Sequence, residues 1–381
     1  MALKVAQRGR VDPFIVMDVM RAAEEHEAAG ADVLHLEVGQ PGTPAPSGVI
    51  AAAKRALDED RLGYTLAYGI GELRQAIAGH YRDFYGLEVP VERIVVTTGS
   101  SGGFLLSFLS AFAHGDRVAL ALPCYPAYRN MLMALGVEPV LLEARAEDRF
   151  QPTPDLLEAA GQLDGLIVAS PSNPTGTMLG AEEMRALAGY CEAAGIRLIS
   201  DEIYHGITYG GPATSALGLS DHAIVINSFS KYFSMTGWRL GWMIVPEDLS
   251  RPIECLQQNF FISPPTLSQR AAVAVFDCLD ECDANVARYA ENRAVLLERL
   301  PAAGFDRLAP ADGAFYVYAD VSALTNDSPE FCRRMLAEAH VAATPGTDFD
   351  PLRGHRFMRF SFAGETAEIE AAAERLIDWR R

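Results

Sequence analysis

Between about residue 94 and residue 245, short apolar and β-branched runs alternate with stretches of helical pattern. This alternation is typical of a mainly parallel β-sheet whose strands are connected by covering helices. The runs are apolar throughout, as expected for strands that are buried on both faces. The expected strands are residues 94–98, 117–122, 137–142, 165–170, 196–200, 223–227 and 240–245. We therefore predict the α/β class, with a seven-stranded, mainly parallel sheet sandwiched by helices.

A change of pattern after about residue 269 indicates a second, smaller domain. A chain of 381 residues also exceeds the usual size of one domain. The further elements expected from the pattern are a long helical region at 270–300, strands at 314–320 and 357–362, helices at 154–161 and 181–194, and an extended proline-rich connector at 41–46.

The formal net charge of −18 argues against binding to nucleic acid or anionic membranes, because both require a cationic surface. No apolar run has membrane-spanning length, and the first residues lack the apolar segment of a secretory signal. A cytoplasmic location is therefore expected. The six cysteines show no CxxC spacing, which favours reduced, mostly buried thiols over disulfides or a zinc site.

Ligands of an open α/β sheet bind where loops leave the carboxyl ends of the strands. The first such loop is rich in glycine and serine, with Ser100, Ser101 and Gly102 at its centre, and a helix is expected to begin near Phe104. Small residues allow backbone N–H groups to approach a phosphate at a helix N-terminus. An ordinary tight turn is the alternative.

Two further loops carry polar groups that could meet a bound ring. The loop 170–176 contains two prolines and a glycine, so it is rigid enough to aim the Asn173 amide, although such a composition is also that of a plain turn. Asp201 and Tyr204 follow the expected strand 196–200. The carboxylate could equally be a helix cap.

The fourth loop contains Lys231 among aromatic and small residues. Partial desolvation in such a setting would lower the lysine pKa and make the free amine nucleophilic. Ser228 and Arg239 flank the lysine with groups suited to a phosphate dianion. Taken together, the four loops match what a phosphorylated pyridoxal ring requires: an imine-forming lysine, an acid for the ring nitrogen and a cradle for phosphate.

These motifs closely resemble those of the class I/II aminotransferases, enzymes of pyridoxal-phosphate fold type I in the aspartate aminotransferase superfamily. The resemblance covers nearly the whole chain. It rests on Ser228-Phe229-Ser230-Lys231 with Gly237-Trp238-Arg239-Leu240-Gly241, Asn173-Pro174-Thr175-Gly176, Asp201 with Tyr204, Leu36-Glu37-Val38-Gly39-Gln40-Pro41, Tyr64-Thr65, Gly71-Glu72-Leu73-Arg74, Gly313-Ala314-Phe315-Tyr316, Pro345-Gly346 and Met358-Arg359-Phe360-Ser361.

The resemblance implies an aminotransferase that moves amino groups between amino acids and 2-oxo acids, with pyridoxal 5′-phosphate as its cofactor. It also implies a large domain at 46–284, a small α+β domain formed by 1–45 and 285–381, and a homodimer. Tyr64 would reach the phosphate of the neighbouring subunit, and Tyr125 would stack on the ring. The chain departs from the family in its phosphate loop, where serines and a glycine replace the usual pattern.

The same resemblance assigns roles to the site residues. Lys231 would anchor the cofactor and move the proton between the substrate and the cofactor, while Asp201 would pair with the ring nitrogen. Asn173 and Tyr204 would hydrogen-bond the ring hydroxyl.

The substrate α-carboxylate would be held by Arg359, with Asn173 and the Gly39 backbone assisting.

Alternative functions remain open at this point. A C–S β-lyase or a decarboxylase could use the same scaffold, and a more remote possibility is a regulator with an aminotransferase-like sensor domain, which would need a DNA-binding module. The substrate side chain is also open. The apolar stretch 14–17 could cover the pocket and favour an uncharged side chain, or could be core packing.

Overall fold

The large sheet contains every strand expected between residues 94 and 245. The computed structural model describes residues 3–380. The strands are β2 (Ile94–Thr97), β3 (Arg117–Leu122), β4 (Glu138–Glu143), β5 (Gly165–Ala169), β6 (Arg197–Asp201), β7 (Ile224–Ser228) and β8 (Gly241–Ile244), so no limit differs from the expected one by more than one residue. Their order is β2-β8-β7-β6-β5-β3-β4.

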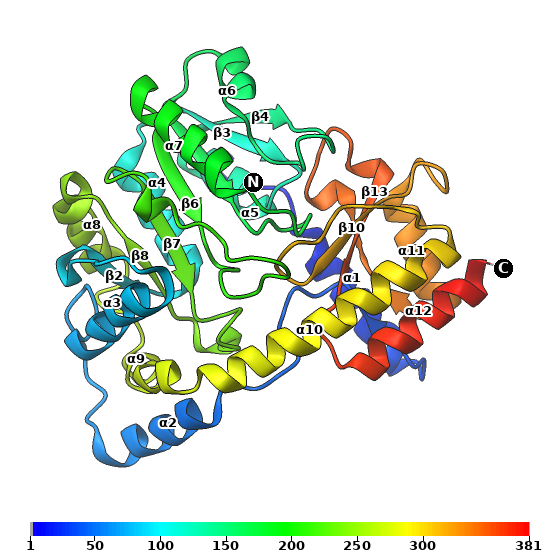
Figure 1. Cartoon of the computed structure of the whole chain (residues 1–381), viewed down its shortest axis with the longest axis horizontal. Coiled ribbons are helices and arrows are strands. Elements are labelled where there is room, and N and C mark those ends of the chain that lie inside the picture. Colours follow the sequence, from blue (N-terminus) through cyan, green and yellow to red (C-terminus); the bar gives the residue numbers. More distant parts are fainter. Residues whose placement is uncertain (1–2, 381) are drawn as a thin grey trace.

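Helices cover both faces of this sheet (Figure 1). One face carries α3 (Gly71–Tyr85), α6 (Pro154–Ala160) and α7 (Ala181–Ala194), and the other carries α4 (Gly99–Ala111), α5 (Pro126–Leu135) and α8 (Glu247–Phe260). Successive side chains of a strand point to opposite faces, so Val95 packs in one core and Val96 in the other. Two-sided burial explains why the strands are apolar throughout.

Strand β8 is antiparallel to both of its neighbours, β2 and β7, whereas the other pairs are parallel. The residues just before β8 therefore lie at the same edge of the sheet as the residues just after β5, β6 and β7. This direction brings Arg239 to the edge where Asn173, Asp201 and Lys231 leave their strands.

A second, four-stranded antiparallel sheet has the order β12-β13-β10-β9. Its strands are β9 (Arg307–Leu308), β10 (Tyr316–Asp320), β12 (Thr344–Pro345) and β13 (Phe357–Ser361), accompanied by α11 (Ser328–Ala339) and α12 (Thr366–Arg380). The N-terminal part of the chain joins this region, because β1 (Leu34–His35) pairs with β11 (Val341–Ala342) and α1 (Ile15–Ala28) packs on β11 and β12. In Figure 1 the blue α1 accordingly lies among the orange and red elements. The division into 46–284 and 1–45 with 285–381 stays a prediction.

The helical region expected at 270–300 is present and is divided into α9 (Thr266–Ala272), the 3₁₀ helix η5 (Val273–Asp277) and α10 (Leu279–Arg299). The break lies at Cys278, whose φ of −118° is not helical, and Asp280 and Glu281 then suit the first turn of α10. Helix α4 begins at Gly99 rather than near Phe104, so the expected phosphate loop is the first turn of a helix.

No helix within residues 3–380 is long and apolar enough to cross a membrane.

Candidate active site

A cavity of about 580 Å³ opens at the edge of the large sheet identified above. It is bounded by the carboxyl ends of β5, β6 and β7, by the first turn of α4, and by residues of α1 and β13. The predicted site residues that line it are Gly39, Ser100, Ser101, Tyr125, Asn173, Asp201, Tyr204, Lys231, Arg239 and Arg359. Segments far apart in the sequence thus meet at one site.

Three predicted site residues do not line this cavity. Gly102 is buried in α4, where an added Cβ would face Thr97, Thr98 and Phe261. Ser228 is the last residue of β7, and its hydroxyl donates to the Leu240 carbonyl (3.0 Å) and accepts the Ser230 N–H. Ser230, which was not predicted, lines the cavity instead.

Tyr64, the third of these residues, has 83% of its surface exposed and lies away from the cavity. Its expected role concerns the neighbouring subunit, so a position outside this chain's own cavity is what that role requires.

Lys231 reaches the cavity from the loop after β7. Its Nζ donates to the Gly39 carbonyl oxygen and lies 5.8 Å from the ring centres of Tyr204 and Phe315. Desolvation and the positive charge of Arg359 lower the lysine pKa to about 8, although Asp201 opposes this shift. The unprotonated amine, which is the nucleophilic form, is therefore much more populated near neutral pH than in an ordinary lysine.

Asp201 ends β6 and is almost completely buried. Burial raises its pKa to about 6, while hydrogen bonds from Tyr128 and from the Ile203 N–H (3.1 Å) work in the opposite direction. Tyr128 was missed by the sequence analysis. The available signal was its position three residues after Tyr125, the residue that precedes α5, a separation of about one helical turn.

Arg359 lies between two aromatic rings, with its guanidinium carbon 4.4 Å from the centre of Tyr316 and 4.8 Å from that of Phe349. Its Nη1 donates to Asn173 Oδ1 (2.8 Å), and its Nη2 donates to the Glu37 carbonyl and to Thr344 Oγ1. Arg359 Nε is a buried donor with no acceptor among residues 3–380. These contacts hold the guanidinium in a fixed plane and leave its Nε–H donor unused. A planar group with an unused donor suits a carboxylate ligand.

Tyr316 contributes more than this stacking. Its hydroxyl is 2.7 Å from that of Tyr204, so the two phenols form a hydrogen-bonded pair at the cavity wall. Tyr316 belongs to the motif Gly313-Ala314-Phe315-Tyr316 named above, but no role was predicted for it.

An anion cradle lies where Arg239 meets the first turn of α4. A Cβ added to Gly99 would come within 2.7 Å of Arg239 Nη2, so the guanidinium packs directly on that turn. The first N–H groups of a helix lack partners within the helix, and its N-terminus carries positive potential. Ser100 and Ser101 belong to this turn and line the cavity, as does Ser230. The corner fits a phosphate dianion.

The residues present fit pyridoxal 5′-phosphate: the Lys231 amine, the buried Asp201 carboxylate and the anion cradle border one cavity, with the Tyr125 ring on its wall. Tyr125 is itself held edge to face by Phe14, with ring centres 5.6 Å apart. Within residues 3–380, no cluster of His, Cys, Asp or Glu side chains forms a candidate metal site.

Comparison with known proteins agrees with this geometry. Residues 31–376 match the family model described as aminotransferase class I and II. The chain is 53% identical to the valine–pyruvate aminotransferase of Mycobacterium tuberculosis, over 99% of this chain and 98% of that protein. It is 34% identical to the aspartate/prephenate aminotransferase of Thermus thermophilus, over 95% of each.

Solved structures give the same result. A crystal structure of an aminotransferase from Mycobacterium tuberculosis superposes with a TM-score of 0.98 at 52% identity, and a putative aminotransferase from Silicibacter pomeroyi does so with 0.93 at 53% identity; each comparison covers 99% of both chains. The chain therefore belongs to the class I and II aminotransferases, a family of pyridoxal-phosphate-dependent transaminases with the aspartate aminotransferase fold.

Proposed function

We propose that this enzyme holds pyridoxal 5′-phosphate in the cavity and exchanges an amino group between valine, or a similar aliphatic amino acid, and a 2-oxo acid such as pyruvate. The observation that carries the substrate class is the set of charged side chains on the cavity, which consists of Asp201, Lys231, Arg239 and Arg359. Each of them has a task on the cofactor or on the α-carboxylate. No cation on the described cavity wall is left for a second carboxylate.

The remaining wall is apolar where α1 covers the cavity, through Phe14, Val16, Met17 and Met20. Methionine adapts its shape to irregular aliphatic groups, so this wall suits a branched side chain. The identity to a valine–pyruvate aminotransferase supports the same substrate class.

The positions of the chain's own residues support the following proposed roles. The Lys231 amine would hold the cofactor through its aldehyde group and would act as the base that takes up and returns the proton of the substrate Cα. Asp201 would pair with the ring nitrogen, and Asn173 and Tyr204 would donate to the ring hydroxyl oxygen. Arg359 holds the α-carboxylate and thereby fixes which bond at Cα is broken. The bound cofactor supplies the electron sink for this chemistry.

The substrate assignment can be tested by mixing the purified, cofactor-loaded enzyme with single amino acids and following the absorbance of the bound cofactor. We expect valine to react at least about a hundredfold more efficiently than aspartate, because a second carboxylate would be buried without a partner. The branched 2-oxo acid should appear in the same amount as the amine lost. A preference for aspartate would contradict the assignment. Ammonia released without an oxo-acid acceptor would indicate elimination chemistry instead.

We also propose a homodimer in which Tyr64 reaches the neighbouring cofactor phosphate. Tyr64, Leu66, Phe260 and Ile262 are all exposed, and their two segments are joined by a hydrogen bond from the Thr65 N–H to Ser263. Clustered exposed apolar side chains of this kind mark association surfaces.

Light scattering should therefore give twice the 41.3 kDa chain mass. Replacing Tyr64 with Phe should weaken cofactor binding to the apoenzyme by about tenfold, since one hydrogen bond to a charged group is lost. The dimer mass should not change in this variant. A monomer with full activity, or unchanged cofactor affinity in Tyr64→Phe, would contradict the proposal.

A further inference from the structure

The loop between β5 and α7 carries Asn173, whose amide oxygen accepts a hydrogen bond from Arg359 (2.8 Å). The loop closes on itself, because the Ser172 N–H donates to the Thr177 carbonyl (3.0 Å). The position of the Asn173 oxygen, and with it the plane of the Arg359 guanidinium, therefore depends on how the two ends of this loop are held.

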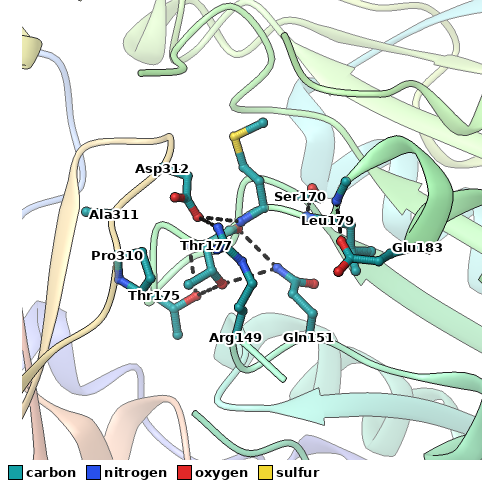
Figure 2. A network of polar contacts seen from close by, with 12 residues as sticks. Arg149, Gln151, Ser170, Thr175, Thr177, Leu179, Glu183, Pro310, Ala311 and Asp312 are labelled. Atoms are coloured by element: carbon teal, nitrogen blue, oxygen red, sulfur yellow. Dashed lines mark hydrogen bonds and ion pairs between the residues drawn. The ribbon is translucent and has the colours of Figure 1, made fainter. Parts of the chain in front are cut away.

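Gln151 contacts both ends of this loop, and Figure 2 shows its contacts with Thr177 at the far end. It comes from the segment after β4, is 3% exposed, and does not line the main cavity. Its amide nitrogen lies 3.3 Å from the Ala169 carbonyl, where β5 ends, and 3.1 Å from the Thr177 carbonyl, at the far end of the loop. Thr177 Oγ1, at 3.3 Å, is a third acceptor within reach. One NH₂ group thus spans the base of the loop.

Other contacts hold the loop independently of Gln151. The Met178 N–H donates to Asp312, which is paired with Arg149, as Figure 2 shows. On the other side, His205 Nε2 is 2.9 Å from the Ser170 carbonyl. A change at Gln151 should therefore move the loop slightly without unfolding it.

We propose that Gln151 is a positioning residue for substrate binding: by tying Ala169 to Thr177 it sets the Asn173 amide, and through it the orientation of Arg359 toward the substrate carboxylate. The proposal rests on the proposed function, in which Arg359 binds that carboxylate. It assigns Gln151 an effect on the affinity for both substrates, because the amino acid and the 2-oxo acid share the carboxylate.

Two variants of nearly equal shape separate the hydrogen bonds from the packing. Gln151→Met removes the donor and keeps the volume. Gln151→Glu replaces the donor with an oxygen that faces the same acceptors; a protonated carboxyl can still donate to one of them, whereas an ionised one cannot. Gln162→Glu makes the same chemical change on an exposed residue of the same region and is the matched control.

The experiment measures KM and kcat for valine and pyruvate, and the binding of 3-methylbutanoate, an unreactive carboxylic acid, by calorimetry. In Gln151→Met we expect both KM values and the dissociation constant of 3-methylbutanoate to rise about tenfold, which is the range for the loss of a buried hydrogen bond. The kcat of this variant should change less than about threefold. In Gln151→Glu at high pH, we expect the KM values and the dissociation constant of 3-methylbutanoate to exceed those of wild type by at least as much as in Gln151→Met. This difference from wild type should become smaller toward low pH, where the carboxyl group is protonated. Gln162→Glu should match wild type.

A double-mutant cycle then asks whether Gln151 acts through Arg359. In an Arg359→Lys background the Gln151→Met change should alter KM less than about twofold, because the group it orients is gone. An equal tenfold loss in both backgrounds would overturn the proposal, as would unchanged KM and 3-methylbutanoate binding in folded Gln151→Met. If the wild-type enzyme fails to transaminate valine, the proposed function fails, whereas the 3-methylbutanoate measurement still tests Gln151.

Discussion

Replacing Lys231 with Ala is expected to reduce steady transamination by a factor of about 10⁴ or more, because in the proposed function this one side chain both anchors the cofactor and carries the substrate proton. The amine faces the cavity, and burial and Arg359 lower its pKa to about 8, which favours the nucleophilic, unprotonated form compared with an ordinary lysine. No other lysine lines the cavity.

The sequence makes this test unusually clear, since Lys4, Lys54 and Lys231 are its only lysines. Reduction of the cofactor-loaded enzyme with borohydride should fix the cofactor on the peptide that contains Lys231, as read by mass spectrometry. Lys54→Ala, on the exposed side of α2 (Ser47–Glu59), is the control and should keep full activity and labelling. Normal turnover in Lys231→Ala, or labelling at Lys54, would remove Lys231 from its role.

The strands of the large sheet could be predicted because a strand that is buried on both faces has a continuous apolar run in its sequence. The sequence of β8 does not indicate the direction of the strand. Only the structure therefore explains why Arg239 lies at the same edge of the sheet as Asp201. The start of α4 was misplaced for a related reason: glycine and serine are weak helix formers, and the first turn is stabilised by its surroundings rather than by propensity.

The site shows the same limit. Residues in short motifs, such as Asn173 and Lys231, could be found from the sequence. The groups that orient the site residues come from elsewhere in the chain: the Glu37 carbonyl that accepts a hydrogen bond from Arg359 is 322 residues away, and nothing in the motif of Glu37 indicates this contact. Gln151 lies outside every motif named above. Local patterns therefore predict which groups react, whereas long-range packing determines how they are aimed.

Asp201→Asn is expected to lower kcat by a factor of about 10² to 10³, the usual effect of removing a preorganised charge from a buried site. The substitution keeps the shape of the side chain, and its oxygen can still accept the Tyr128 hydroxyl. It removes the negative charge that would stabilise a protonated ring nitrogen, so electrons leaving the substrate Cα are accommodated less well. Asp221→Asn, on a side chain that is 94% exposed, is the matched control.

The pH dependence separates this electrostatic role from a structural one. The ionised carboxylate is the form that pairs with the ring nitrogen, and burial places the pKa of Asp201 at about 6. Cofactor binding to the wild-type apoenzyme should therefore be strong above that pH and weaken as the pH falls through it. The cofactor phosphate also titrates near pH 6, but equally in both proteins, so the difference between the two titrations isolates the carboxylate. Because asparagine cannot titrate, cofactor binding to Asp201→Asn should depend less on pH than binding to wild type. Identical pH profiles of the two proteins, or a kcat of Asp201→Asn within about threefold of wild type, would mean that Asp201 does not carry the charge at the ring.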